Sequence, residues 1–239
     1  MSAQKKKKRP SPAAKRSRNS WVFPAVIVAI VVIGVVAVAL TAMGGNDSGS
    51  SGPKNAVQVS AEVSVDGSTL PDFDASAAKD PAVGLPAPEI GSVNFRGKNV
   101  QAGGATGSPY AVVFLAHWCP HCQAEMPRLV SAAENGQIAG VDVIGVATGT
   151  SDTNPNYPPS EWFAREDWPF AVMVDDASST AASAYGLTGY PYMVFVDAEG
   201  NVVGRTSGEI AEDDLQAIFE ALAAGDPIPI PGAGASSSN

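Results

Sequence analysis

Residues 110–122 read YAVVFLAHWCPHC and bring both cysteines of the chain directly behind a run of apolar residues. The nearly continuous apolar run over 110–116 is typical of a strand that is buried on both faces. Pro120 then opens a segment with helical spacing of its apolar residues, which ends before Gly136. The stretch therefore predicts a buried strand, a C-x-x-C pair at the strand's end, and a helix that begins within that pair.

Strands and helices alternate around this stretch. A hairpin is predicted over 89–101, with its turn at 96–99. Periodicity after the cysteines predicts four more strands and three more helices, namely strands at 141–147, 170–174, 192–197 and 202–206 and helices at 159–166, 178–185 and 212–224. This order predicts an α/β fold in which a central mixed sheet carries helices on both faces.

Composition sets the boundaries of this core. Residues 44–53 read GGNDSGSSGP, which is the composition of a flexible linker, and four prolines over 71–88 predict an irregular arm. We therefore assign 44–84 to a linker and irregular arm that contains one short strand, and 85–224 to a single domain. The Pro-, Gly- and Ser-rich residues 225–239 are predicted to be a disordered tail.

A long apolar run precedes the linker. Residues 21–43 contain no charged side chain and exceed the roughly 20 residues that span a bilayer as a helix. Basic residues gather over 1–20, so the positive-inside rule places this tail in the cytoplasm and the domain over 85–224 outside the cell membrane. A cleaved signal peptide is the alternative, but its apolar region is only about 7–15 residues long. The run therefore predicts an uncleaved, single-pass signal-anchor.

The charge of the chain is strongly asymmetric. Eight of the 15 basic residues lie within 1–20, whereas no acidic residue precedes Asp47. The part after the apolar run carries 7 basic and 24 acidic residues, and so is a poor partner for nucleic acid or for an anionic membrane surface. Two cysteines and two histidines exclude a framework of several disulfides and leave little room for an all-histidine metal centre.

The C-x-x-C pair carries the chemistry. A thiol at a helix N-terminus lies near unpaired N–H groups and the positive end of the helix dipole, which favour the thiolate. We therefore expect Cys119 to be the exposed nucleophile and Cys122 the buried resolving thiol. Pro120 presets the helical backbone, and a protonated His121 adds positive charge beside Cys119. An inert structural disulfide and one half of a zinc site are the alternatives, and the strand–motif–helix context disfavours both.

The stretch over 114–122, followed by Gly189-Tyr190-Pro191 just before an apolar strand, resembles the thioredoxin-like superfamily. The residues from Cys122 to Pro127, CQAEMP, extend the motif to C-x-x-C-x-x-E-x-P, which is similar to membrane-anchored TlpA/ResA-type thiol-disulfide oxidoreductases. The resemblance covers roughly residues 85–224 and implies a thioredoxin-like fold.

The resemblance also implies roles for single residues. Pro191 is expected to be the cis-proline that faces the cysteines, with Tyr190 lining the substrate groove through its backbone. Trp118 is expected to shield the disulfide and to offer apolar surface to a substrate peptide. Glu125 is expected to be the acid/base partner of the buried Cys122 thiol, although a carboxylate in the first helical turn is also explained by the helix dipole alone.

Two features depart from the pattern. Val113 stands where thioredoxin has a buried aspartate, so proton transfer relies on Glu125 or water. The Pro-His dipeptide is that of the oxidant DsbA and favours oxidation, whereas the family resemblance favours reduction. The sequence predicts a site poised toward oxidation, with His121 as the main cause. The expected partners are thiols and disulfides of exported proteins and an unidentified membrane redox partner.

A second function class is a copper-delivering protein of thioredoxin-like fold. Cys119, Cys122 and one histidine would supply its soft ligands. Such proteins carry C-x-x-x-C and a distant histidine, whereas the spacing here is shorter and no histidine follows Cys122. The sequence therefore favours the enzyme, for which no metal and no cofactor are expected, and it predicts an exposed position at the strand end for His117.

Overall fold

The computed structural model describes residues 57–230 of the chain. The basic tail predicted over 1–20 and the membrane helix predicted over 21–43 lie outside the described residues, as do residues 231–239. Within 57–230, none of the helices has both the length and the apolar character needed to cross a membrane.

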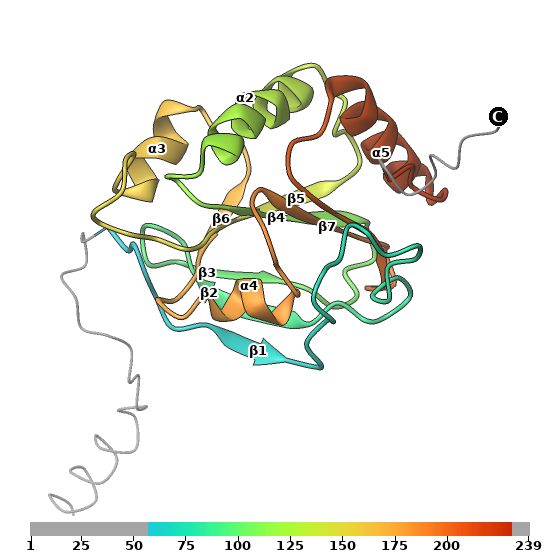
Figure 1. Ribbon diagram of the computed structural model, residues 1–239, viewed down its shortest axis with the longest axis horizontal. Helices are drawn as coiled ribbons and strands as arrows, with labels where there is room; N and C mark the ends of the chain where they lie inside the picture. The colour runs from blue at the N-terminus through green and yellow to red at the C-terminus, as the bar shows by residue number, and fades with distance from the viewer. Residues whose placement is uncertain (1–56, 231–239) are drawn as a thin grey trace, which may run out of the picture. The chain divides into compact units, whose positions relative to one another are not determined.

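The described residues form two sheets and four helices (Figure 1). The strands are β1 (Ser64–Asp66), β2 (Glu89–Val93), β3 (Asn99–Ala102), β4 (Tyr110–Leu115), β5 (Asp142–Ala147), β6 (Ala171–Val174), β7 (Tyr192–Val196) and β8 (Val202–Ser207). The helices are α2 (Pro120–Glu134), α3 (Pro159–Arg165), α4 (Thr180–Ala184) and α5 (Glu212–Ala224). From residue 89 onward, each predicted strand and helix is present with small shifts of its ends. The short strand predicted over 56–65 is reduced to β1.

The larger sheet has the strand order β6-β5-β4-β7-β8 and is mixed, as predicted. β4 lies at its centre, parallel to β5 and antiparallel to β7, and β6 and β8 form the two edges. Every residue of β4 is buried, which explains the continuous apolar run in the sequence. β1, β2 and β3 form a separate antiparallel sheet, in which the predicted hairpin pairs β2 with β3.

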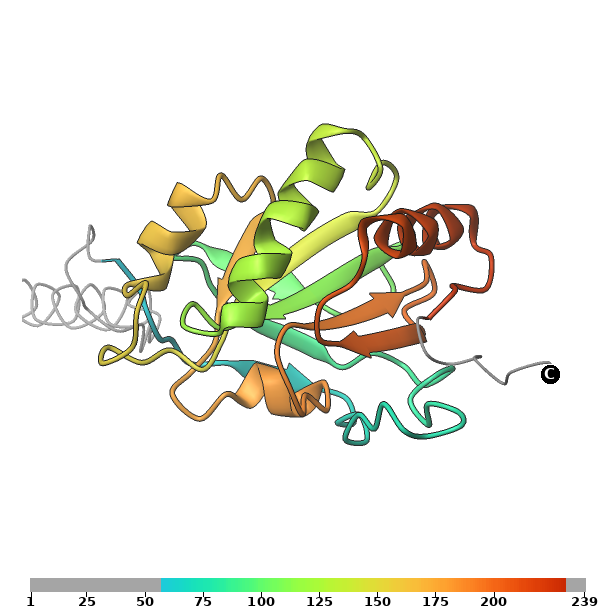
Figure 2. The ribbon, with the colours of Figure 1, turned by 45° about the horizontal axis from the view of Figure 1, so that its top comes forward.

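Helices cover both faces of the larger sheet. α2, α3 and α5 lie on one face, whereas α4 and the three-stranded sheet lie on the other (Figures 1 and 2). Met126, Trp162 and Phe219 pack into the core of the first face, and Phe114 and Tyr185 belong to the core of the second. α2 follows directly after the central strand, so its N-terminus lies at the carboxyl-terminal end of β4, where ligands bind in open α/β sheets.

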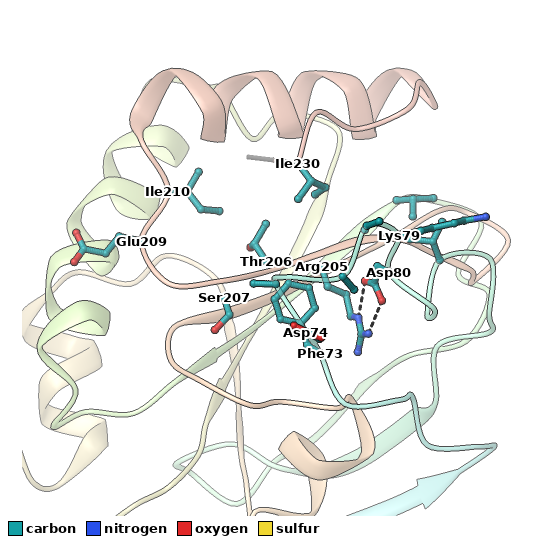
Figure 3. Close-up of a pocket in the computed structure, with 16 residues that line it drawn as sticks. Phe73, Asp74, Lys79, Asp80, Arg205, Thr206, Ser207, Glu209, Ile210 and Ile230 are labelled. Carbon is teal, nitrogen blue, oxygen red and sulfur yellow. Dashed lines mark hydrogen bonds and ion pairs between the residues drawn. The ribbon is translucent and has the colours of Figure 1, made fainter. Parts of the chain in front are cut away.

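The arm between β1 and β2 contains no helix or strand, but it packs firmly on the domain. Leu70 is buried, and the guanidinium of Arg205 on β8 is bound by Asp80 of the arm, with its Nε 2.9 Å from Oδ2 (Figure 3). The side chain of Arg205 is fully buried by this contact. Residues 57–84 therefore belong to the folded domain, which begins before the predicted boundary at residue 85.

The chain also continues to pack after α5. Ile228 and Ile230 lie against the core, next to Gly204 on the edge strand β8. A side chain at Gly204 would bring its Cβ within 2.5 Å of Ile228, so the glycine makes room for this segment. The tail predicted to be disordered from residue 225 is thus ordered up to residue 230, because its two isoleucines bury apolar surface on β8.

Candidate active site

Cys119 occupies the N-cap position of α2. Its backbone is extended, with φ −74° and ψ 122°, and Pro120 takes the first helical position, where a missing N–H leaves no hydrogen bond unmade. Its Sγ lies 4.0 Å from the carbonyl oxygen of Tyr190, and 6% of the residue is exposed. The predicted nucleophile is thus almost completely buried beside the loop before β7.

Cys122 lies one turn further along α2 and is fully buried. Its Sγ accepts a hydrogen bond from the backbone N–H of Ala116 at 3.4 Å. Burial raises the pKa of the Cys122 thiol, and the Ala116 contact offsets only part of that effect. Both cysteines are free thiols in this structure and both are buried, so the predicted exposure of Cys119 is wrong, and the roles of attacking and resolving thiol stay predictions.

Glu125 is also fully buried, on the same side of α2 as Cys122. Its Oε2 accepts hydrogen bonds from Arg128 Nη1 at 3.0 Å and from the backbone N–H of Ile210 at 3.1 Å. Its Oε1 has no hydrogen-bond partner among the described residues. Burial is the largest influence on the pKa of Glu125 and raises it, although both hydrogen bonds act in the opposite direction. A buried carboxyl with one uncommitted oxygen is suited to carrying a proton.

The loop before β7 meets the cysteine motif from the other side. The peptide bond between Tyr190 and Pro191 is cis, as the resemblance implies. Trp118 donates a hydrogen bond from Nε1 to the carbonyl oxygen of Gly149 at 2.7 Å, and its ring packs edge-on against Tyr190 at a centroid distance of 5.9 Å. Trp118 and Tyr190 are both half-buried, so they present apolar surface beside Cys119.

His121 projects into solvent and contacts a residue far along the chain. Its Nδ1 lies 2.8 Å from Oε1 of Glu209, and 67% of its side chain is exposed. Glu209 Oε2 in turn binds Arg128 Nη1 at 2.9 Å. Arg128 and Glu209 are site residues that sequence reasoning missed. Arg128 had a local signal, because it stands three residues after Glu125, whereas no sequence pattern points to Glu209.

His117 is buried, not exposed as predicted, with 1% of the residue accessible. The loop after β5 folds over it and engages both of its ring nitrogens. Nδ1 donates to the carbonyl oxygen of Pro155 at 2.7 Å, and Nε2 accepts from the N–H of Ser151 at 3.2 Å. Over residues 57–230, no three histidine, cysteine, aspartate or glutamate side chains gather as metal ligands. The geometry therefore does not favour the copper-binding alternative.

Known proteins have sequences similar to this one over most of the domain. The thiol:disulfide interchange protein DsbE homolog of Paracoccus denitrificans is 26% identical over 158 residues, which are 63% of this chain and 83% of that protein. The thiol-disulfide oxidoreductase ResA of Geobacillus thermodenitrificans is 25% identical over 141 residues, or 59% of this chain and 78% of that protein. The predicted enzyme class, a thioredoxin-like thiol-disulfide oxidoreductase, is confirmed by these relatives.

The fold has counterparts among solved structures. An uncharacterized conserved protein from Geobacillus kaustophilus superimposes with a TM-score of 0.53 at 20% identity, over 62% of this chain and 85% of that one. The model of the AhpC/TSA family matches residues 83–205, a range that runs from the end of the arm through the cysteine motif to β8. Because this match takes in more than half of the chain, the chain belongs to the AhpC/TSA family of thioredoxin-like proteins.

Proposed function

We propose that the protein is a membrane-tethered thiol-disulfide oxidoreductase that exchanges the Cys119–Cys122 disulfide or dithiol with exported proteins. The observation that carries this proposal is the placement of Cys119 at the N-cap of α2, 4.0 Å from the carbonyl oxygen of Tyr190, with Cys122 buried one turn behind it. A substrate sulfur therefore reacts with Cys119, of which 6% is accessible, and not with Cys122, of which none is accessible.

Oxidation of a substrate proceeds in two exchange steps. A substrate thiolate attacks Sγ of Cys119, the bond between Cys119 and Cys122 breaks, and Cys122 leaves as a thiolate. A second thiolate of the same substrate then attacks the substrate sulfur of the mixed disulfide and releases Cys119 as a thiolate. The substrate has been oxidised to a disulfide, and the two electrons that it lost now reside in the dithiol of the enzyme. Reduction of a substrate disulfide is the same sequence in reverse.

Glu125 serves the buried half of this exchange. The Cys122 thiolate forms where burial disfavours charge, so it must receive a proton from a nearby group. Glu125 lies on the same face of α2, and burial raises its pKa, so it retains a proton at higher pH than an exposed glutamate. Its uncommitted Oε1 is the oxygen from which Cys122 takes the proton, and to which it returns the proton in the reverse reaction.

The cellular location follows from the chain before the domain. The uncharged apolar run over 21–43 and the basic residues over 1–20 support a single-pass anchor with the N-terminus in the cytoplasm. The domain then meets exported proteins, and a membrane redox partner restores its cysteines. A membrane-impermeant thiol reagent tests this in intact cells, using the cysteine-free C119S/C122S protein. We expect it to label Ser178→Cys on the domain, and Ser11→Cys only after lysis.

The exchange reaction is tested by trapping its intermediate. Cys122→Ser leaves Cys119 without its resolving partner, so we expect full-length C122S protein to accumulate mixed disulfides with client proteins. Cys119→Ser should abolish activity and trap none, because the remaining thiol is buried. Non-reducing electrophoresis followed by mass spectrometry of the reduced bands measures both. Clients on the C119S protein with none on C122S would reverse the two roles.

A further inference from the structure

Glu209 lies between β8 and α5 and uses both carboxylate oxygens on active-site side chains. Oε1 lies 2.8 Å from His121 Nδ1, and Oε2 lies 2.9 Å from Arg128 Nη1. One third of the Glu209 side chain is exposed. In Figure 3, Glu209 points toward α2, away from the Asp80–Arg205 pair. Its position is thus determined by the active-site helix.

Arg128 connects this carboxylate to a second one. The same Nη1 atom that binds Glu209 lies 3.0 Å from Oε2 of Glu125. The four side chains therefore form one charge chain, His121–Glu209–Arg128–Glu125, which runs from the exposed dipeptide of the motif to the buried carboxyl. The residue after Glu209, Ile210, also donates its N–H to Glu125. The β8–α5 connection therefore contacts this charge chain through two residues.

We propose that Glu209 is a positioning residue for thiol-disulfide exchange, which controls the proton on Glu125 by sharing Arg128 and restrains His121 by direct contact. The proposal rests on the function proposed above and adds a residue outside the motif to it. Glu209 contacts neither cysteine, so it acts only through the side chains that it holds.

Electrostatics determines the direction of the first effect. Burial raises the pKa of Glu125, Arg128 lowers it, and the negative charge of Glu209 raises it again. The remaining titratable group beside Glu125 is the thiol of Cys122. Without the charge of Glu209, Arg128 interacts with Glu125 only, and the repulsion between the two carboxylates is lost. Glu125 then ionises at lower pH, so Cys122 loses its proton donor at a lower pH than in the wild-type protein.

The second effect acts on the redox equilibrium. Contacts with His121 and Arg128 lower the pKa of Glu209, so its carboxylate is charged near neutral pH. Without this charge, the positive charges of Arg128 and of protonated His121 are no longer balanced beside the motif. A more positive surrounding stabilises the Cys119 thiolate, which exists only in the reduced protein. The equilibrium with glutathione then shifts toward the reduced protein.

Glu209→Gln in the full-length protein tests both effects. The rate of reduction of the oxidised protein by dithiothreitol should fall about 10-fold on the limb of the pH–rate profile that depends on Glu125, which is less than the 10²–10⁴-fold that a general acid contributes in full. The limb of the pH–rate profile that Glu125→Gln abolishes should move to lower pH. The glutathione equilibrium constant should shift about 10-fold toward the reduced protein, which corresponds to about 30 mV.

Two further variants separate the effect that acts through Arg128 from the effect that acts through His121. In an Arg128→Gln protein, Glu209→Gln should move the pH–rate profile less than in the wild-type protein, because only the direct repulsion between Glu209 and Glu125 is then removed. In a His121→Ala protein, Glu209→Gln should still move the profile but shift the glutathione equilibrium less. Glu212→Gln is the matched control, since it removes an exposed charge from the first turn of α5, three residues away. It should leave rate and equilibrium unchanged.

The outcomes distinguish the two proposals. If the wild-type protein exchanges with glutathione and Glu209→Gln behaves like Glu212→Gln, Glu209 is not a positioning residue. A profile that moves as far in the Arg128→Gln background as in the wild-type background also overturns the inference. If the wild-type protein does not exchange with glutathione at all, the proposed function itself is wrong. A thermal unfolding curve of each variant verifies that it is folded.

Discussion

The sulfur of Cys119 and the carbonyl oxygen of Tyr190 lie 4.0 Å apart, although 71 residues separate them in the chain. The pairing of β4 with β7 produces this proximity, because the motif follows one strand and the Tyr190–Pro191 loop precedes its antiparallel neighbour. The two segments meet at Cys119. A substrate sulfur that reacts with Cys119 therefore comes close to side chains of both segments, such as Trp118 and Tyr190.

Trp118→Ala should slow exchange with protein disulfides about 10-fold and exchange with glutathione much less. The indole packs against Tyr190 and presents apolar surface that a peptide covers but a small thiol does not. Loss of one such aromatic contact typically weakens binding by about 1–2 kcal/mol. Parallel measurements of the rates at which the reduced enzyme reacts with disulfide-bonded insulin and with oxidised glutathione compare the two. Trp118→Phe is the control, and equal slowing of both substrates by Trp118→Ala would contradict a binding role.

His121→Pro should shift the glutathione equilibrium toward the oxidised protein, about 10-fold or about 30 mV in reduction potential. Proline is accepted in the first turn of a helix, so the variant removes the imidazole with little change of backbone. A positive imidazole stabilises the thiolate of the reduced protein, and the contact with Glu209 limits this effect. An unchanged potential would show that Glu209 cancels the charge of His121 completely, and the predicted poise toward oxidation would fail.

From spacing alone, the site was predictable only where its residues are local, whereas the placement of Tyr190 and Pro191 beside the cysteines came from the family resemblance. Cys119 and Cys122 share one motif, and Glu125 follows at helical spacing, so a single periodic segment brings them together. Glu209 stands 88 residues after His121. Its contact depends on how the β8–α5 connection passes α2, which no spacing encodes. His117 was wrongly predicted to be exposed for the same reason, since the residues that cover it come from a distant loop.

In the fold, too, local elements were predictable from sequence and contacts between distant residues were not. The strand–helix alternation from β4 onward was predictable because each element carries its own periodicity, and continuous burial makes β4 continuously apolar. The arm has no periodicity, so its composition indicated only irregular structure. Its attachment depends on Asp80 and Arg205, which are 125 residues apart, and on isolated apolar residues such as Leu70. Single buried residues separated by loop residues give no sequence pattern that distinguishes such an arm from a linker.

Asp80→Asn should destabilise the protein by about 3 kcal/mol, because it leaves the fully buried guanidinium of Arg205 without its counter-charge. Burial raises the pKa of Asp80, but its contacts with Arg205 and the Ala82 N–H outweigh burial and lower it. The ion pair therefore stabilises the fold above the unfolded-state pKa of aspartate, and this stability is lost as the pH falls through the lower folded-state value. Urea unfolding at neutral and at acidic pH measures the difference. Asp72→Asn, an exposed change in the same arm, is the control.

Glu125→Gln should make the protein more stable than wild type at neutral pH and leave it about equal in acid. Burial raises the folded-state pKa of Glu125 above its unfolded value, so the wild-type protein is stabilised by the protonated carboxyl at low pH. That stability is lost between the unfolded-state and folded-state pKa values, by up to about 1.4 kcal/mol for each pH unit between them. Glutamine does not ionise and keeps an oxygen for the N–H of Ile210, so its unfolding free energy lacks this decline. Urea unfolding of both proteins across this pH range should give curves that diverge as the pH rises, whereas Glu134→Gln, exposed at the end of the same helix, should run parallel to wild type. Parallel curves for Glu125→Gln would mean that Glu125 is ionised throughout and cannot donate the proton that Cys122 requires.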